Sequence, residues 1–184
     1  ISLIQYALGR YGQAIQISQQ SLAIAHQIGD RRIERQSLAT LGNAYRHLQD
    51  FEKALRYKYE SLKVAQEIQD HRGEAAALNN LGMVYKAMGD VKSAITYYKK
   101  SLAIAADMGE QQMMSQVLRN LGNAYHAQGD YEQTIECYEQ LLELVRQAGD
   151  KRSEMHILKN LASACHATGR YGRAAGYVRS LTCA

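Results

Sequence analysis

The 184-residue chain contains no proline, and its 14 glycines stand mostly at recurring junctions. Proline breaks a helix interior, because its ring removes a backbone donor and clashes with the preceding turn. Glycine at regular junctions is typical of the turns that end helices. The absence of proline and the placement of glycine therefore predict long uninterrupted helices joined by short turns.

Cysteine and long apolar runs are also scarce. The three cysteines, Cys137, Cys165 and Cys183, are odd in number and show no CxxC spacing, which argues against a disulfide framework and a zinc site. We expect Cys165 to be a buried packing residue. No apolar run approaches the ~20 residues of a membrane span, and no charged-then-apolar leader opens the sequence. We therefore expect a cytoplasmic protein that does not bind membranes.

Charge of one sign is not concentrated anywhere in the chain, whose net charge is +4 at pH 7. Nucleic-acid binders gather basic residues and interleave them with aromatic ones, so nucleic acid ranks last among the expected partners. Catalytic patterns are missing too: the sequence has no nucleophile on a strained turn, no glycine-rich phosphate loop and no paired acids. It predicts a protein that is not an enzyme and has no cofactor.

What the sequence does contain is a repeat of 40 residues. The run LGNAY at 41–45 returns as LGMVY at 81–85, as LGNAY at 121–125 and, altered, as LASAC at 161–165. A second column keeps the same phase and consists of Ala14, Ala54, Ala94, Thr134 and Ala174. One repeat cannot bury its own apolar face, whereas repeats stacked in series share a continuous core. The period therefore indicates a solenoid whose function lies on a surface.

Apolar residues recur at three-and-four spacing within each repeat, which predicts two amphipathic helices. Glycine-aspartate pairs such as Gly129-Asp130 separate them, because glycine ends one helix in the left-handed conformation and aspartate caps the next. The predicted helices cover 11–28, 31–48, 51–68, 71–88, 91–108, 111–128, 131–148, 151–168 and 171–182. Small residues in the first helices are expected to face the alanine column of the second helices and let the axes approach. These residues are Gly42, Gly82, Gly122 and Ala162.

These features resemble the tetratricopeptide repeat family over the whole chain. The first helix carries Leu-x-x-Leu-Gly-x-x-Tyr, as at 38–45, and the second carries alanine followed by an aromatic residue such as Tyr98 or Tyr138. The sequence departs from the family pattern in three ways: Leu38 and its equivalents replace tryptophan, the closing proline is missing, and the repeat has 40 residues rather than 34. The longer repeat resembles the arrays of Pins-type adaptors, kinesin light chains and bacterial signalling proteins. The resemblance implies an all-α fold, a right-handed α-solenoid, or superhelix, of antiparallel helix pairs.

The repeat phase also sets the expected domain organisation, a single array over residues 1–184. This array has a partial repeat at 1–30, full repeats at 31–70, 71–110 and 111–150, and a truncated repeat at 151–184. No polar terminal cap is visible at either end, although solenoids usually need one. An alternative function therefore stays open: a self-assembling or regulatory segment of a larger signalling protein, with end-to-end self-association through residues 1–8 and 171–181.

The resemblance places the first helices of successive repeats along a concave groove. The columns expected to line it hold no aspartate or glutamate, whereas acids such as Glu132 and Glu143 crowd the second helices. The candidate groove residues are Gln36, Asn43, Arg46, Asn79, Lys86, Gln116, Arg119, Asn123, His126, His156, Lys159 and His166. Cationic side chains donate to carboxylates, and carboxamides pair with an extended backbone. The predicted function is a protein-interaction scaffold that binds an acidic peptide segment of a partner; an ordinary solvated helix face is the alternative.

Other polar residues near the groove receive structural roles or none. Asn80, Asn120 and Asn160 lie next to the core and are assigned to neighbouring backbone groups. His126 and His166 share a column, but equivalent helices lie roughly 8–10 Å apart and no third ligand accompanies the pair, so no metal site is predicted. The charge of the groove should change near pH 6.5, because unperturbed histidine titrates there.

Overall fold

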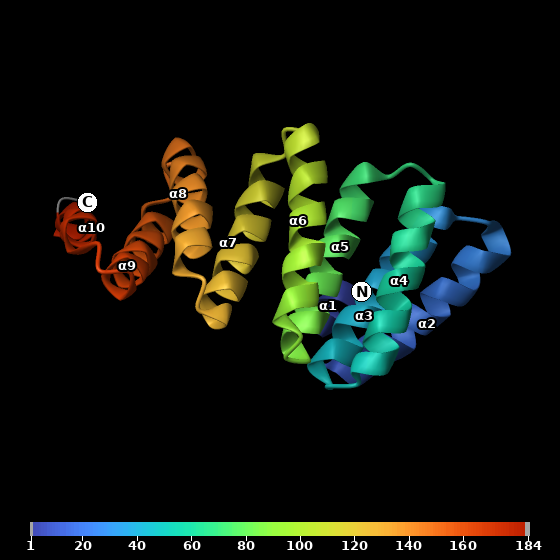
Figure 1. The fold of residues 1–184 in the computed structure, drawn as a ribbon. Helices are drawn as coiled ribbons and strands as arrows, with labels where there is room; N and C mark the ends of the chain where they lie inside the picture. Colours follow the sequence, from blue (N-terminus) through green and yellow to red (C-terminus); the bar gives the residue numbers. More distant parts are fainter. Residues whose placement is uncertain (1, 183–184) are drawn as a thin grey trace. The chain divides into compact units, whose positions relative to one another are not determined.

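The computed structural model describes residues 2–182, and over that range it consists of helices and short turns with no strand (Figure 1). The predicted all-α class is confirmed. The helices are α1 (Ser2–Ala7), α2 (Tyr11–Ile28), α3 (Arg31–His47), α4 (Phe51–Glu67), α5 (His71–Ala87), α6 (Val91–Asp107), α7 (Gln111–Gln128), α8 (Tyr131–Gln147), α9 (Lys151–Ala167) and α10 (Tyr171–Thr182). None of these described helices is long and apolar enough to cross a membrane.

The chain forms two compact units, residues 1–93 and 94–184, which we call the N-terminal and C-terminal units. In the N-terminal unit each of α1 to α4 packs on the next helix, and α3 also packs on α1 and α5. In the C-terminal unit α7, α8, α9 and α10 pack in the same consecutive way (Figure 1). The turns between them are only a few residues long, so neighbouring helices are antiparallel. Each unit thus builds its core from helix pairs, as the repeat predicted.

The glycine-aspartate turns have the predicted conformation. Gly129 takes φ +82° after α7, and the Asp130 carboxylate accepts a hydrogen bond from the backbone N–H of Gln133 at 3.1 Å. Two turns lack the glycine, and there Gln49 and Gln69 adopt the left-handed conformation with φ of 61° and 54°. Residues other than glycine are strained in the left-handed region, because their Cβ atom approaches the following carbonyl oxygen. The turn geometry is therefore kept even where the sequence does not favour it.

The nearest neighbours of Gly42 and Gly122 are not the alanine column, which corrects the prediction at these two positions. A Cβ atom added to Gly42 would lie 2.8 Å from Lys58 Cε, and one added to Gly122 would lie 3.0 Å from the Tyr138 ring. Lys58 and Tyr138 lie one helical turn beyond the alanine column. Glycine in α3 and α7 therefore makes room for a long buried side chain of the second helix.

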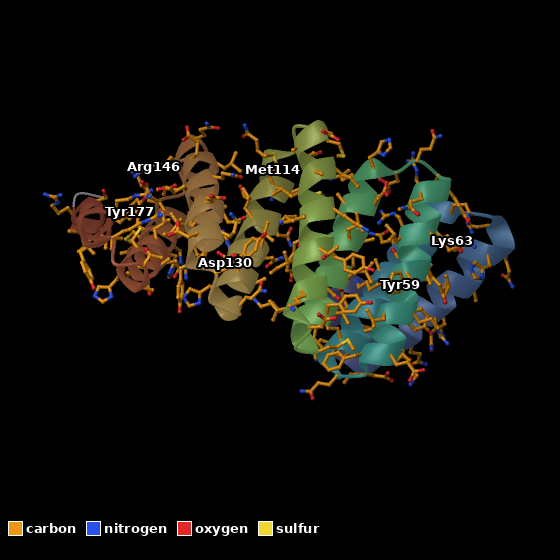
Figure 2. The ribbon with its side chains drawn as sticks, in the orientation of Figure 1. Tyr59, Lys63, Met114, Asp130, Arg146 and Tyr177 are labelled. Carbon is orange, nitrogen blue, oxygen red and sulfur yellow. The ribbon has the colours of Figure 1, made fainter. Side chains whose placement is uncertain are left out.

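Glutamates near the start of α3, α5 and α9 tie each of these helices to the helix before it. Glu154, at 6% exposure, accepts a hydrogen bond from Arg146 at 2.7 Å and pairs with Lys151 at 3.2 Å. Figure 2 shows Arg146 near the end of α8, where α9 follows. Glu34 and Glu74 repeat the arrangement in the N-terminal unit, with His26 and Gln66 as partners. Sequence reasoning missed these contacts.

The two cysteines in the described part of the chain form no disulfide. Cys137 and Cys165 are both free and buried, and the packing role expected for Cys165 is confirmed, since its side chain is fully buried. Burial raises the pKa of the Cys137 thiol to about 11. Cys183 lies outside the described residues.

Candidate functional site

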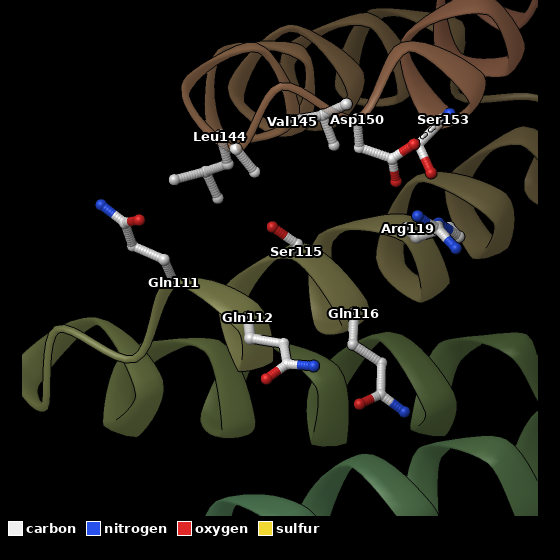
Figure 3. A pocket seen from close by; sticks show the side chains of 10 residues that line it. Gln111, Gln112, Ser115, Gln116, Arg119, Leu144, Val145, Asp150 and Ser153 are labelled. Atoms are coloured by element: carbon white, nitrogen blue, oxygen red, sulfur yellow. Dashed lines mark hydrogen bonds between the residues drawn. The ribbon is translucent and has the colours of Figure 1, made fainter.

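Two adjoining hollows lie between α7 and α9 in the C-terminal unit, over the end of α8 (Figure 3). The wide hollow, of about 610 Å³, is lined by Gln111, Gln112, Ser115, Gln116, Arg119, Leu144, Val145, Ala148, Asp150 and Ser153. The narrow hollow, of about 200 Å³, is lined by Arg119, Asn123, Tyr138, Leu141, Ser153, His156, Ile157 and Asn160. Both share Arg119 and Ser153, so they form one continuous depression.

The wide hollow combines an apolar side with a carboxamide side. Leu144 and Val145 reach it from α8, and glutamines line it from α7 (Figure 3). Each carboxamide offers two donors and an accepting oxygen. Apolar surface flanked by such groups suits a segment with an apolar side chain and an unpaired backbone.

The hollow contains one acid, which the groove columns did not include. Asp150 caps α9, and its Oδ1 accepts a hydrogen bond from Ser153 N at 3.0 Å. Hydrogen bonds from Ser153 and the charge of Arg119 lower the pKa of the Asp150 carboxyl. The expectation of a lining without acids therefore fails here, because the hollow extends past the helix face to the cap of the next helix. Arg119 and Asp150 give it one charge of each sign.

Two polar groups of the narrow hollow are joined by a hydrogen bond. The Tyr138 hydroxyl donates to Asn123 Oδ1 at 2.6 Å. Tyr138 is 2% exposed, whereas Asn123 is exposed. Asn160, assigned from sequence to a structural role, is exposed and lines the same hollow.

One sequence difference between the two units lies directly at the wide hollow. In the N-terminal unit Arg35 of α3 reaches the cap of α5, where its Nε lies 2.9 Å from Asp70 Oδ2. Eighty residues later, two repeat lengths on, Asp150 has kept its place but Ser115 stands where Arg35 stood. Serine is too short to make the pair. The position that holds an ion pair in one unit is therefore an open depression in the other.

Four of the predicted groove residues lie together around this depression: Gln116, Arg119, Asn123 and His156. Lys159, His126 and His166 belong to the same unit and are exposed, but they do not line either hollow. The His126 and His166 rings lie edge-on against Tyr131 and Tyr171, at 5.4 and 5.1 Å. No group of three or more His, Cys, Asp or Glu in the described part of the chain could hold a metal ion.

The other predicted residues belong to the N-terminal unit and differ in their availability. Gln36 is exposed, Asn43, Arg46 and Lys86 are half-buried, and Asn79 is buried at 4% exposure. Burial lowers the pKa of the Lys86 amine.

Arg46 is engaged in an aromatic cluster with Tyr6, Tyr11 and His47. It donates to His47 Nε2 at 2.9 Å, and the His47 ring stacks on Tyr11 at 4.9 Å. Because guanidinium can only donate, His47 Nε2 accepts, so the imidazole is neutral with its proton on Nδ1. Burial and the charge of Arg46 lower the pKa of His47, which favours the same form.

Sequence reasoning missed Gln111, Gln112, Ser115, Asp150, Ser153 and Tyr138. The columns were taken from the middle of the first helices, whereas these residues lie at helix starts, at a cap, or on the second helix. A comparison of Arg35 with Ser115 at equivalent positions could have located the depression.

Comparison with known proteins identifies the family. The sequence profile described as the tetratricopeptide repeat matches residues 1–67, 34–107 and 113–181. A search among curated proteins finds no matching sequence.

Solved structures with this fold include BtubC (BKLC) from P. vanneervenii, which is 19% identical with a TM-score of 0.86 over 98% of this chain and 75% of that protein. A putative kinesin light chain of Podosopora anserina is 19% identical with a TM-score of 0.79 over 99% and 90% of the two chains. A Rap protein in complex with competence and sporulation factor is 20% identical with a TM-score of 0.76, over 99% of this chain and 61% of that one. These likenesses show the fold, which is typically a non-enzymatic scaffold, and the profile shows the family: the chain belongs to the tetratricopeptide repeat family.

Proposed function

We propose that the chain is a protein-interaction scaffold that binds an extended acidic segment of a partner protein in the depression between α7 and α9. Family membership supports the protein-interaction role. The observation that carries the site is the continuous hollow around Arg119, where Ser115 stands in the place of an arginine of the N-terminal unit. The remaining candidate groove residues are proposed to extend the contact, with Lys159 beside it on α9.

The chemistry of the depression supports a peptide with a carboxylate. Arg119 is exposed, and among the described residues it has no ion-pair partner, so its guanidinium can receive a carboxylate in a two-point contact. The glutamines of α7 can pair with backbone N–H and C=O groups in either direction. Asp150 disfavours a continuous run of acids, because like charges repel at close range. We therefore propose one acidic side chain opposite Arg119, with neutral or basic residues near Asp150.

A structural neighbour supports a peptide as the ligand class. The Rap protein of similar fold was solved with competence and sporulation factor bound. At 20% identity the likeness extends to the fold, and the use of a comparable surface is our proposal for this chain. We also propose a cytoplasmic location, since the two described cysteines are free thiols.

The substitution Ser115→Arg tests the proposal. It recreates the arginine of the N-terminal unit opposite Asp150 and should fill the wide hollow through an ion pair that the fold already accepts at Arg35 and Asp70. We expect a peptide array that contains acidic sequences to bind the wild-type chain and to lose most of that signal with Ser115→Arg. Array fluorescence at constant protein concentration is the measurement.

The matched control is Gln140→Arg, which adds the same charge at an exposed position of α8 outside both hollows. It should leave the array pattern unchanged. A second arm, Arg119→Glu combined with Lys159→Glu, should abolish capture of acidic peptides at unchanged helicity by circular dichroism. Equal capture by Ser115→Arg and wild type would remove the depression as the binding site.

A further inference from the structure

We propose that Tyr138 and Lys58 are positioning residues: each fixes a groove asparagine with its NH₂ group outward, so that the surface selects ligands rich in hydrogen-bond acceptors. The proposal rests on the function proposed above and deepens it, because it names the chemistry that the surface recognises. The two asparagines, Asn123 and Asn43, stand in the same column of the repeat.

In the C-terminal unit the orientation of Asn123 follows from the Tyr138 hydroxyl. That hydroxyl donates its one hydrogen to Asn123 Oδ1, at 2.6 Å, and the amide nitrogen, which has no accepting lone pair, could not take the place of the oxygen. The carboxamide oxygen of Asn123 is therefore turned toward the buried ring. Its Nδ2 hydrogens, on the opposite branch of the planar group, are left for the narrow hollow.

In the N-terminal unit a different side chain imposes the same orientation. The Lys58 amine is fully buried and donates to Ala39 O at 2.7 Å and to Asn43 Oδ1 at 2.6 Å. Because the amine donates a hydrogen toward Asn43, the carboxamide oxygen must face it, since an amide nitrogen cannot accept a hydrogen bond. Asn43 is half-buried and presents its Nδ2 hydrogens away from the amine.

The arrangement occurs in two repeats that lie 80 residues apart, whereas Met83 and Ser163 stand in the same column of the other two. Lysine and tyrosine share only a donor at the end of a long side chain, yet both lie 15 residues after the asparagine that they hold. In both units the residue before the asparagine is glycine, and it is against this glycine that the long side chain packs. A Cβ at Gly42 or Gly122 would push the donor out of reach. The glycine, the asparagine and the residue with the buried donor thus form a three-residue motif.

An asparagine held in this way is a one-sided recognition group. A free carboxamide can rotate to meet a donor or an acceptor, whereas one whose oxygen is occupied offers hydrogens only. Each unit therefore favours carboxylate and backbone carbonyl oxygens at this point. Glutamate should be preferred to glutamine at the contacting position of a peptide, since glutamine brings hydrogens that Asn123 cannot accept.

The test has a spectroscopic arm that needs no ligand. In the full chain labelled with ¹⁵N-asparagine, Tyr138→Phe removes the donor and keeps the ring. We expect the Asn123 side-chain signals to shift and to gain nuclear Overhauser contacts with the ring at position 138, because the carboxamide is then free to turn. The matched control is Tyr177→Phe, which removes a hydroxyl that bonds Glu139 elsewhere in the same unit and should leave Asn123 unchanged.

Lys58→Met repeats the experiment in the N-terminal unit and keeps the proposal testable if Tyr138→Phe fails to fold. The Asn43 signals should move with Lys58→Met and stay with Lys63→Met, which removes an exposed amine of the same helix. Unchanged asparagine signals in both Tyr138→Phe and Lys58→Met would overturn the positioning role, whatever the chain binds.

The binding arm uses array peptides in matched pairs that differ only in glutamate against glutamine. We expect wild type to favour the glutamate member of each bound pair and Tyr138→Phe to lose about fivefold of that preference, the equivalent of one hydrogen bond of about 1 kcal/mol. If wild type captures no peptide, the proposed function fails while the spectra still decide the positioning. If wild type binds and Tyr138→Phe keeps the full preference, the inferred selectivity is wrong.

Discussion

At the scale of single residues, Lys58 is the clearest case of a side chain whose role depends on its surroundings. It lies in the core of the N-terminal unit with no acid as a partner, and its two hydrogen bonds match the two hydrogens of a neutral amine. Burial lowers the pKa of this amine well below the usual 10.5, and the charge of Arg46 lowers it further. A sequence pattern gives no sign of this, because lysine in an amphipathic helix is ordinarily exposed.

Lys58 should make stability rise with pH. Between its folded pKa and 10.5 the unfolded chain binds one more proton than the folded chain, so deprotonation favours folding as the pH increases. Relative to Lys58→Met, the unfolding free energy of wild type should rise by up to about 1.4 kcal/mol per pH unit in that window. Urea unfolding of both chains at pH 7, 8, 9 and 10 measures the difference. If the unfolding free energies of wild type and Lys58→Met changed with pH in parallel, Lys58 would stay protonated in the folded chain.

Gln69 offers a second prediction at this scale. It holds φ 54° in the turn between α4 and α5, at a place where every equivalent turn except the one at Gln49 uses glycine. Because a left-handed conformation costs an L-residue roughly 1–2 kcal/mol and glycine nothing, Gln69→Gly should raise the unfolding free energy by about 1 kcal/mol. Urea unfolding at pH 7 is the measurement.

The control for Gln69→Gly is the same exchange in a helix interior. Gln20 is exposed in the middle of α2, where glycine costs about 1 kcal/mol. Gln20→Gly should therefore lower stability while Gln69→Gly raises it. A loss of stability in both variants would show that the Gln69 side chain contributes more than its backbone costs.

At the scale of elements, the helices were largely predictable from the sequence. Predicted and observed ends agree within one residue from α2 to α10, because glycine and aspartate mark most turns chemically. The turns at Gln49 and Gln69 keep the capping aspartates Asp50 and Asp70 but lack the glycine, so the repeat period supplied the rest of the signal. The repeat period therefore locates a turn even where the turn residue itself has no preference for the left-handed conformation.

The site was less predictable than the helices. Four residues from the predicted columns, Gln116, Arg119, Asn123 and His156, line one depression, because helical geometry fixes which residues share a face. The columns could not show that Asp150 joins the same depression or that Ser115 lines it. The contribution of Asp150 and of Ser115 depends on how far a side chain reaches toward the next helix. The spacing of residues within one helix gives no information on that reach.

Glu154 gives the prediction for elements, because it joins α8 to α9. Hydrogen bonds from Arg146 and Lys151 lower the pKa of its carboxyl below the usual 4.5, so its contribution is present above that pH and is lost as the pH falls through the folded pKa. Glu154→Gln should therefore have a lower urea midpoint than wild type at pH 7, and the gap should close in acid. Urea unfolding at pH 7 and at pH 3 measures it.

Glu143→Gln is the reference for this experiment, since Glu143 is exposed on α8 and makes no ion pair among the described residues. It removes the same charge and should leave the midpoint nearly unchanged. A gap between Glu154→Gln and wild type that persists at pH 3 would assign the effect to packing.

At the scale of the whole molecule, helix contacts run almost entirely between neighbours along the chain. In each unit the packed pairs are consecutive helices, and only α3 also packs on the helices two places away. In such an array stability is approximately a sum of repeat and nearest-neighbour terms. A substitution in one repeat should therefore weaken its own neighbourhood more than the rest.

Gly122→Ala tests this locality. The added methyl group would lie 3.0 Å from the Tyr138 ring, and overpacking of this kind costs about 1–3 kcal/mol. Hydrogen exchange followed by mass spectrometry should show faster exchange in α7, α8 and α9, with α2, α3 and α4 unchanged. The companion variant Gly172→Ala adds a methyl group with nothing within 4 Å and should not speed exchange anywhere. A uniform loss of protection across both units in Gly122→Ala would instead mean that the chain opens as one cooperative body, because only global unfolding exposes distant helices together.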